Sequence, residues 1–391
     1  MAEPSPASPP RTNETDEATA QPAGSSTAAA ILPASHWESV CYLTPHRGYR
    51  SSFCSPDWRL AKHGSAFCVQ IALEPEGDDA DSGYNDVLSS TASLASSILH
   101  YRTVHGRTYH ASIGNADAWE PNDDMHAESM DIHHHMSTLM LGDKLFLAPI
   151  GPNPKRVLDI GTGTGIWAID FADAYPGTEV IGTDLSPMQP AWVPPNVKWE
   201  LDDANLDWTW GDNTMDFIHA RMLVGNIVDW RKFYRDAFRC CKPGGWMESH
   251  EASLLWRSDV GIREDSAMGQ WGHVFQEAGR KIGRTFRLVD DELQQKYMAE
   301  AGFVDIVVKD IKCPSGDWPK DEKQKELGLF ARLALLSDLN GYILHIWGSV
   351  MGWTPEEIAV YAAHMRRELS DPKIQPWFLR RVVYGRKPET S

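Results

Sequence analysis

The chain has 391 residues, of which 42% are hydrophobic and 23% are charged, and its formal net charge is −17. This composition is ordinary for a globular protein, and the length allows one large domain with appendages or two domains. A duplex-binding surface needs clustered Lys and Arg to displace counterions from phosphates, and the sequence has no dense basic run, so we expect no direct nucleic-acid binding. No stretch approaches the roughly 18 consecutive apolar residues that a membrane helix needs, so we expect no membrane partner.

The first 35 residues are rich in Pro, Ser, Thr and Ala, and Arg11 is their only basic residue. They hold too few bulky apolar residues to form a core, so residues 1–35 are predicted to be a disordered tail. The tail lacks the basic-then-apolar pattern of a secretory signal. We therefore expect a cytoplasmic protein, and we expect its six cysteines to be reduced thiols.

The segment 36–80 is unusual, because it holds three of the six cysteines and two tryptophans without any sustained helical or strand period. Acidic and glycine-containing sequence follows it. Two interpretations stay open: a small packed extension, or a non-native insertion such as a translated intron, with the second favoured. Sequencing the spliced transcript distinguishes them, since a message that keeps these codons excludes the insertion.

Helical periodicity begins after this segment. Apolar residues between Val87 and Tyr101 predict one helix, and a second begins near Asp123 and runs toward Phe146. The apolar positions of the second helix suit packing against another domain. Residues 81–150 are therefore predicted to form an N-terminal helical cap. Within the second helix lies a tract of three histidines, His133 to His135, but adjacent helical residues point in different directions, so no metal site is expected there.

Residues 151–391 alternate between strand and helix signals. Such βαβ alternation predicts a parallel sheet with helices on both faces, which is an α/β fold. The segment 314–375 is mostly helical and precedes the last strand, so it forms a predicted helical lid with Trp318, Trp347, Trp353 and Trp377 available to cover an apolar substrate. Plain packing of these tryptophans is the alternative. The predicted strands are 156–160, 179–183, 197–201, 215–219, 246–250, 304–311 and 378–384.

A glycine-rich loop follows the first of these strands. The strand contains Asp159, and Gly161, Gly163 and Gly165 then lead into a helix near Trp167. Glycine permits positive φ and close approach of a ligand to the backbone. The NH groups and dipole at the helix N-terminus favour a negative group, such as the carboxylate of a methionine moiety.

Two rival phosphate-binding motifs fit this loop less well. A nucleotide P-loop needs a Lys after the last glycine, and a dinucleotide site needs GxGxxG rather than the GxGxG found here. The next strands also end in acidic residues, with Asp184 placed to bind ribose hydroxyls and Asp202-Asp203-Ala204 placed to contact adenine. Capping or solvated roles are the alternatives for these side chains, and packing is the alternative for Trp167.

Together these segments resemble the fungal LaeA-like methyltransferases, which belong to the Rossmann-like class I superfamily. The resemblance covers residues 81–388, and Gly182-Thr-Asp-Leu-Ser-Pro-Met-Gln-Pro190 is its most specific part. The other matching segments are Tyr109-His110, Leu158–Ile169, Asp216–Arg221, Leu223–Ile227, Lys242–Trp246 and Val383–Pro388. Ala220 departs from the family pattern, whereas His219 and Arg221 fit it.

The resemblance implies a seven-stranded sheet and S-adenosylmethionine as the cofactor. It implies that Asp159 and the three glycines line the methionine end of that cofactor, that Asp184 and the adjoining Leu185 lie at the ribose, and that Asp203 approaches adenine. Tyr109 and His110, in the segment before the core, are expected to close over the site. The family includes a nuclear regulator of secondary metabolism, so the nucleus is an alternative location.

Methyl transfer from such a cofactor needs mainly orientation and desolvation of the reactants. A hydroxyl acceptor still needs a base, and His219, His250 and Glu251 are the catalytic candidates because they are expected at strand ends that face the cofactor. A buried structural hydrogen bond is the alternative for His219. The acceptor itself stays open. We expect O-methylation of a small-molecule metabolite; the alternatives are a regulator that acts through protein partners and a protein methyltransferase.

Overall fold

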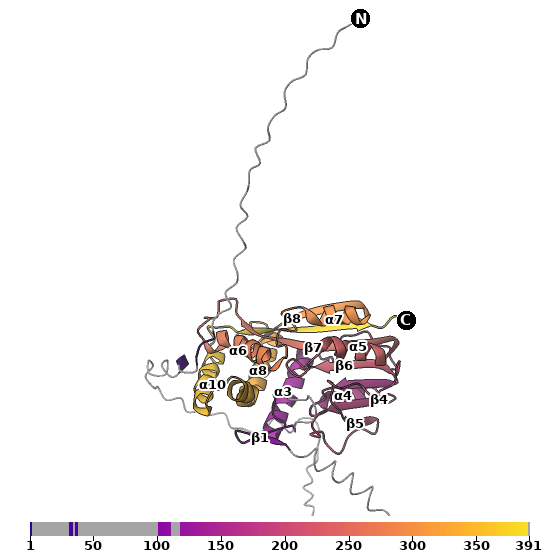
Figure 1. The fold of residues 1–391 in the computed structure, drawn as a ribbon, viewed down its shortest axis with the longest axis horizontal. Coiled ribbons are helices and arrows are strands. Elements are labelled where there is room, and N and C mark those ends of the chain that lie inside the picture. Colours follow the sequence, from indigo (N-terminus) through magenta and orange to yellow (C-terminus); the bar gives the residue numbers. More distant parts are fainter. Residues whose placement is uncertain (2–30, 34–35, 38–100, 111–117, 390–391) are drawn as a thin grey trace, which may run out of the picture. The chain divides into compact units, whose positions relative to one another are not determined.

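The computed structural model describes Met1 and residues 31–33, 36–37, 101–110 and 118–389 (Figure 1). All of these except Met1 belong to one compact unit, Ile31–Ser391. The predicted helix between Val87 and Tyr101 lies almost wholly outside the described residues, as do most of the tail 1–35 and of the segment 36–80. From that segment only His36 and Trp37 are described, and Trp37 is buried with its ring centroid 5.1 Å from that of Tyr361.

A seven-stranded sheet forms the centre of this unit, in the order β5-β4-β3-β6-β7-β9-β8. Within this sheet, the first five strands in chain order, β3 to β7, pair in parallel, and β9 runs antiparallel to both of its neighbours. The chain moves outward from β3 to β5 and then returns to the other side of β3, so the strand order reverses between β3 and β6. The strands are Arg156–Ile160 (β3), Glu179–Asp184 (β4), Val197–Leu201 (β5), Met215–Arg221 (β6), Cys241–Arg257 (β7), Val304–Pro314 (β8) and Trp377–Arg386 (β9).

Both faces of the inner strands are buried, because alternate residues of β3 and β6 enter two separate hydrophobic clusters. Val157 and Phe217 pack with Trp167 and Phe171 of the first helix after β3. Their neighbours Leu158 and Ile218 belong to the larger cluster on the other face, which includes helical residues such as Phe233 and Phe275. The predicted α/β class with helices on both faces is therefore confirmed, and it explains why the strands are short apolar runs.

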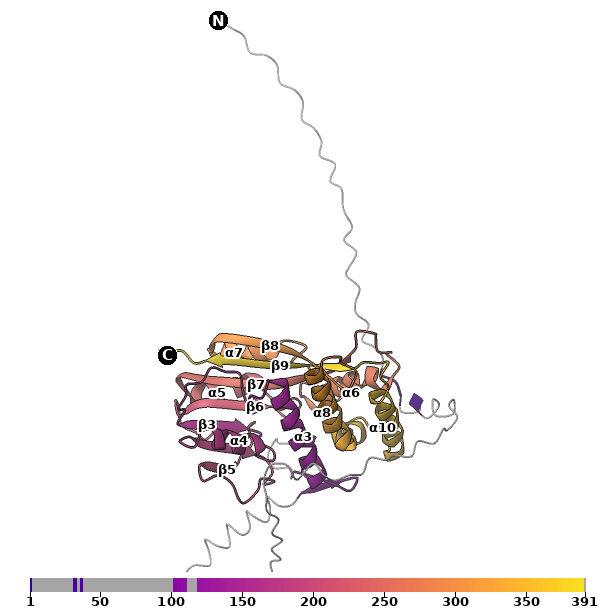
Figure 2. The same ribbon diagram turned by 180° about the vertical axis from the view of Figure 1, so that it is seen from behind.

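Nine helical segments are described, and four of them lie between β8 and β9 in the chain. These four form the predicted helical insertion before the last strand. α8 packs on α3, while η3 and α10 pack on α6, and α3 and α8 lie side by side in both ribbon views (Figures 1 and 2). The segments are Asp124–Met140 (α3), Ile166–Ala174 (α4), Trp230–Cys240 (α5), Ala267–Ile282 (α6), Leu293–Ala301 (α7), Glu322–Ser337 (α8), Leu339–Ile343 (α9), the π-helical turn Leu344–Val350 (η3) and Pro355–Leu369 (α10).

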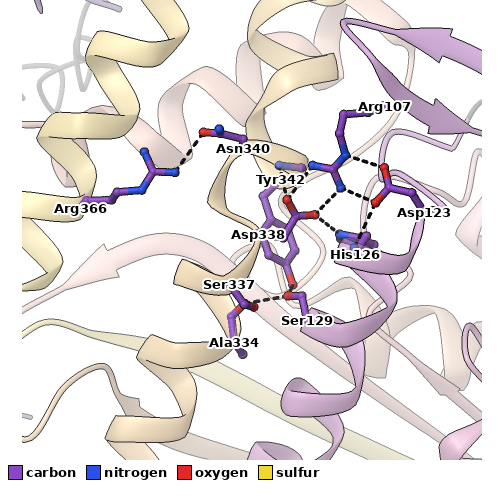
Figure 3. A network of polar contacts seen from close by, with 11 residues as sticks. Arg107, Asp123, His126, Ser129, Ala334, Ser337, Asp338, Asn340, Tyr342 and Arg366 are labelled. Carbon is purple, nitrogen blue, oxygen red and sulfur yellow. Dashed lines mark hydrogen bonds and ion pairs between the residues drawn. The ribbon is translucent and has the colours of Figure 1, made fainter. Parts of the chain in front are cut away.

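A short hairpin, Arg102–Val104 (β1) and Arg107–Tyr109 (β2), precedes α3. Its Arg107 donates to Asp123, the N-cap of α3, and to Asp338, which precedes α9. His126 Nδ1 contacts the same Asp338 carboxylate at 2.9 Å (Figure 3). Hairpin, cap helix and lid are thus joined through one buried carboxylate.

The structure corrects several details of the sequence prediction. The last strand is antiparallel, so the sheet is mixed. β7 continues to Arg257 instead of ending at His250, and the hairpin and α7 were not predicted. Of the four lid tryptophans, Trp347 is fully buried in the core against Trp271 and Phe275.

The three consecutive histidines of α3 have three different surroundings. His133 contacts Arg380, His134 Nε2 lies 2.9 Å from Asp170, and the His135 ring packs on Phe330. In the described part of the chain no group of three or more His, Cys, Asp or Glu side chains converges as metal ligands would.

Within those same residues, no single helix has the length and apolar character to cross a membrane. The bent pair formed by α8 and the segment Leu339–Val350 passes that test by length and composition when its two parts are taken together.

Candidate active site

A cavity opens at the carboxyl ends of β3, β4, β5 and β6, where the strand order reverses. This is the position at which open α/β sheets bind their ligands. We call it the donor cavity. Of the predicted site residues, it is lined by Asp159, Gly161, Gly163, Trp167, Asp184, Leu185, Asp202, Asp203, Ala204 and His219.

The glycine loop has the backbone that its sequence predicts. Gly161, Gly163 and Gly165 have φ values of +66°, +58° and +81°, a region that side chains with a Cβ rarely adopt. A Cβ on Gly161 would lie 2.4 Å from Leu223, and one on Gly163 would lie 2.9 Å from Met130. Gly165 does not line the cavity. A Cβ there would lie 2.4 Å from the Trp199 ring, so this glycine allows α4 and β5 to pack closely.

Asp184 stabilises the loop and the turn that follows β4. Its Oδ2 accepts from the backbone NH of Gly163 at 2.8 Å, and its Oδ1 accepts from that of Ser186 at 3.0 Å. Burial raises the pKa of this carboxyl, and the backbone NH groups oppose that rise. A carboxylate has about four acceptor sites, so Asp184 can accept from a ribose hydroxyl besides these backbone groups.

Asp203, rather than Asp202, has a buried acceptor without a partner in the cavity. Asp203 is 7% exposed, its Oδ1 accepts from the backbone and side chain of Asn205, and its Oδ2 is buried with no hydrogen-bond partner. Asp202 instead accepts from the backbone NH of Asp203. A buried acceptor without a partner calls for a donor, and the exocyclic amino group of adenine is one.

Asp159, His219 and Trp167 form a buried unit under the loop. His219 Nδ1 lies 2.7 Å from Asp159, Thr162 donates to the other Asp159 oxygen, and the His219 and Trp167 rings stack with centroids 3.8 Å apart. Burial raises the pKa of Asp159 to about 6 and lowers that of His219 well below its ordinary value. Near neutral pH the pair is therefore a carboxylate and a neutral imidazole, and the buried His219 Nε2 has no hydrogen-bond partner.

Arg221, at the end of β6, supplies a positive charge that the sequence analysis did not assign to the site. It lines the donor cavity and donates to His134 Nδ1 at 3.1 Å, and within the described residues it forms no ion pair with a carboxylate. Burial lowers its pKa to about 10, so it remains charged near neutral pH. The glycine loop, Arg221, Asp184 and Asp203 together fit a ligand with a carboxylate, a ribose and an adenine, as S-adenosylmethionine has.

The structure does not bring His250, Glu251 or Tyr109 to the cavity wall. Because β7 runs on to Arg257, His250 and Glu251 lie in mid-strand and not at its end. His250 contacts Glu248, and Glu251 accepts from the backbone NH groups of Leu223 and Val224. Tyr109 is fully buried beside His345, whereas its neighbour His110 lines the cavity.

A second cavity adjoins the first, and we call it the apolar chamber. Four residues line both: Glu120, His133, Met222 and Tyr342. Met222 has a φ of +59°, a conformation that is rare for a side chain of its size. None of the four lid tryptophans lines the chamber. Its other walls are Trp119, Met136, Val224, Ala252, Ser253, Leu254, Trp256, Trp271, Phe275, Ala331, Ala334, Leu335, Phe378 and Arg380.

Sequence reasoning missed the shared residues, although α3 carried a signal. His126, Met130 and His133 all line the donor cavity and are spaced by four and three residues, so they share one face of the helix. Because Met130 also fits the apolar pattern of α3, this face is not distinguishable in the sequence from a packing surface.

Comparison with known proteins agrees with this geometry. Residues 132–307 match the family model described as a methyltransferase domain. The chain is 38% identical to methyltransferase pytC of Aspergillus terreus over 82% of this chain and 99% of that protein. It is 32% identical to the secondary metabolism regulator LAE1 of Cochliobolus heterostrophus, over 73% of this chain and 94% of the relative.

A third relative is the protein-methionine methyltransferase laeA of Emericella nidulans, at 28% identity over 88% of this chain and 94% of the relative. These matches extend well beyond the glycine loop and span nearly the full length of the relatives. The chain therefore belongs to the LaeA-like family of class I methyltransferases, and it is an enzyme whose methyl donor is S-adenosylmethionine.

Proposed function

We propose that this enzyme transfers a methyl group to an oxygen atom of a small apolar molecule that binds in the apolar chamber. The observation that carries the proposal is the shared wall between the chamber and the donor cavity. An acceptor in the chamber meets the donor at Glu120, His133, Met222 and Tyr342. Most other wall residues are aromatic or aliphatic, which is typical of small-molecule sites with few polar groups.

Glu120 is the group best placed to take a proton from a hydroxyl acceptor. It lines both cavities, its carboxylate accepts from Asn226 Nδ2 at 3.3 Å, and burial raises its pKa. A carboxyl whose pKa is raised toward neutrality is a stronger base than an exposed one. His219 lines only the donor cavity, so its free Nε2 is less suited to this role.

Methyl transfer needs no reactant other than the donor and the acceptor. The acceptor oxygen forms its bond to the methyl carbon as its proton passes to Glu120, and the pair of the broken S–C bond stays on sulfur. The protein supplies orientation and exclusion of water, which account for much of the rate in reactions whose group is already activated.

The test is to incubate the pure full-length protein with methyl-labelled S-adenosylmethionine and a metabolite extract of its host. We expect label in a small apolar product, and a Glu120→Gln variant should lose most of that label while binding the donor normally. Label found only on protein supports the protein-methylating activity named for one relative. Absence of label from both fractions supports the regulatory role named for another.

A further inference from the structure

One side chain of the apolar chamber is out of place in an apolar wall. Arg380, on β9, lines the chamber and is only 3% exposed. Its guanidinium contacts the Met222 thioether and His133 Nε2, and its Nε is buried with no hydrogen-bond partner. A thioether is a weak acceptor and a neutral imidazole nitrogen carries no charge, so the guanidinium has no anionic partner in the chamber wall.

The carboxylates around Arg380 do not pair with it. Within the described residues it forms no ion pair, and Glu251 is the acidic side chain that acts on its charge. Both Glu251 oxygens already accept backbone NH groups, and burial raises the pKa of Glu251 to about 8, so near neutral pH this side chain is mostly uncharged. Neutral His133 cannot compensate the cation either, since burial lowers its pKa well below the ordinary value.

The neighbouring strand residue shows the ordinary arrangement. Arg381 is also buried, but it forms a two-pronged pair with Asp310 at 2.6 and 2.7 Å and donates to the Val289 carbonyl. Buried charges are normally paired in this way, because an unpaired one carries a large desolvation cost. Arg380 carries that cost without a carboxylate partner among the described residues, and besides Met222 and His133 its cation meets only the Phe378 ring, 5.6 Å from the ring centroid.

We propose, building on the methyl transfer proposed above, that Arg380 binds an anionic oxygen of the acceptor, so that the substrates are apolar, ring-sized hydroxy acids. Arg380 lines the chamber but not the donor cavity, and its guanidinium contacts His133 and Met222 of the shared wall, so the acid group binds on the chamber side of that wall. The hydroxyl then lies at the junction beside Glu120. A guanidinium recognises a carboxylate or enolate through two parallel hydrogen bonds, which fixes the orientation of a rigid acceptor.

The probes are a hydroxynaphthoic acid and the carboxamide of the same isomer, which differ in charge but hardly in shape. Binding to the full-length protein, saturated with S-adenosylhomocysteine, is followed by calorimetry near neutral pH. We expect the acid to bind about tenfold or more tighter than the amide, since a charged hydrogen-bonded partner in a buried site contributes at least that much. Equal affinity of the wild-type protein for the two probes overturns the proposal.

Arg380→Met removes the charge while keeping an unbranched chain of similar reach. We expect this variant to lose the preference for the acid, to bind the amide as before, and to keep or raise its melting temperature, because an uncompensated buried cation is removed. A preference that survives in Arg380→Met contradicts the proposal. Arg380→Lys retains the charge without the planar fork and should show an intermediate preference.

Arg386→Met on the same strand is the matched control. Arg386 pairs with Asp305 away from the chamber, so its loss should leave both probes unaffected. The proposed function is tested separately by label transfer to the metabolite extract. Labelled neutral products together with no acid preference would refute the role of Arg380 while leaving the methyl transfer intact.

Discussion

The two adjoining cavities are built in different ways. The donor cavity is formed largely by the connections that follow four neighbouring strands, and its key contacts involve backbone groups, such as the bond from Gly163 NH to Asp184. The apolar chamber is assembled from side chains between Trp119 and Arg380. They come from the segment before α3, from α3, the turn after β6, β7, α6, α8, α9 and β9. One cavity is set by local chain geometry, and the other by tertiary packing.

Because of this difference, binding of the methyl donor and choice of the methyl acceptor depend on different parts of the structure. A site made from backbone and strand ends recognises one fixed ligand, whatever the helices around it carry. A chamber made from packed side chains changes shape with each substitution in its walls. Donor binding and acceptor choice should therefore respond independently to mutation, and the following predictions test that independence.

The largest effect is expected from Gly163→Arg. The residue has a φ of +58°, and a Cβ there would already contact Met130 at 2.9 Å, so a long side chain strains the loop and fills the donor cavity. We expect S-adenosylhomocysteine affinity to fall by more than about 100-fold, equivalent to roughly 3 kcal/mol or more. Calorimetry measures it. Gly177→Arg is the control, since nothing lies within 4 Å of a Cβ at Gly177. Micromolar binding by Gly163→Arg would show that the donor lies elsewhere.

Ala334→Phe should produce the opposite pattern. Ala334 is buried in the wall of the apolar chamber, and it does not line the donor cavity. A phenyl group fills space that the acceptor needs, and overpacking costs about 1–3 kcal/mol of stability. We expect kcat/KM for the acceptor to fall about 30-fold, while donor affinity changes less than about twofold.

The control for this variant lies one residue away. Leu333 on the same helix is 49% exposed, so Leu333→Phe should leave both donor binding and acceptor turnover unchanged. If Ala334→Phe weakens the donor as strongly as the acceptor, the two cavities are not independent and the comparison fails.

Asp338→Asn should lower the stability of the fold and not act on one cavity alone. The Asp338 carboxylate binds Arg107, His126 and the NH of Gly341, and it thereby holds His126 and the following helix at the donor cavity (Figure 3). Breaking a buried pair is costly, but Arg107 is 14% exposed, so we expect the free energy of unfolding to fall by about 2 kcal/mol. Chemical denaturation measures this, with Asp321→Asn, at an exposed helix cap, as the control.

The effect of Asp338→Asn should depend on pH. Burial alone would raise the pKa of Asp338, but hydrogen bonds from His126 and Arg107 hold it below its ordinary value. A lowered pKa contributes stability that is present above the pKa of the unfolded chain, near 4, and is lost as pH falls through the folded value. The difference between wild type and variant should therefore shrink below about pH 4. If the difference in unfolding free energy between wild type and variant stayed constant below that pH, the stability would come from packing and not from the charge of Asp338.

The sequence predicted most of the fold because the inner strands β3, β4 and β6 are buried on both faces and appear as short apolar runs. It missed the hairpin, whose strands are three residues each, and the direction of β9, because a helical insertion gives no sign of how the chain returns to the sheet. It also ended β7 at His250. That error placed His250 and Glu251 at a strand end and made them catalytic candidates.

The donor cavity was predictable for the same reason, since loop glycines and strand-end acids are local features. The chamber was not. His133 and Arg380 are 247 residues apart in sequence and meet only through the packing of α3 against the sheet. Glu120 lies in an irregular segment with no motif around it. Whether an arginine is paired, as Arg381 is, or unpaired, as Arg380 is, depends on neighbours that no local pattern reveals.

The smallest effect is expected from variants that test which of two adjacent acids in the donor cavity, Asp202 or Asp203, binds adenine. Asp203→Asn keeps the Oδ1 acceptor for Asn205 but replaces the free Oδ2 with an amide donor that faces the adenine amino group. Asp202→Asn removes the same charge from an acid that accepts from the backbone. We expect Asp203→Asn to weaken S-adenosylhomocysteine about tenfold, and Asp202→Asn to weaken it less than twofold, which is about 0.4 kcal/mol.

Because both variants lose one negative charge, long-range attraction of the donor falls equally in the two, and their difference isolates the hydrogen bond. S-inosylhomocysteine, in which the amino group is replaced by a carbonyl, sharpens the test. Asp203→Asn should bind this analogue better than the wild-type protein does, since its new amide donor meets an acceptor. Equal losses for the two variants, without that reversal, would reduce Asp203 to a source of charge and leave the adenine contact to the backbone.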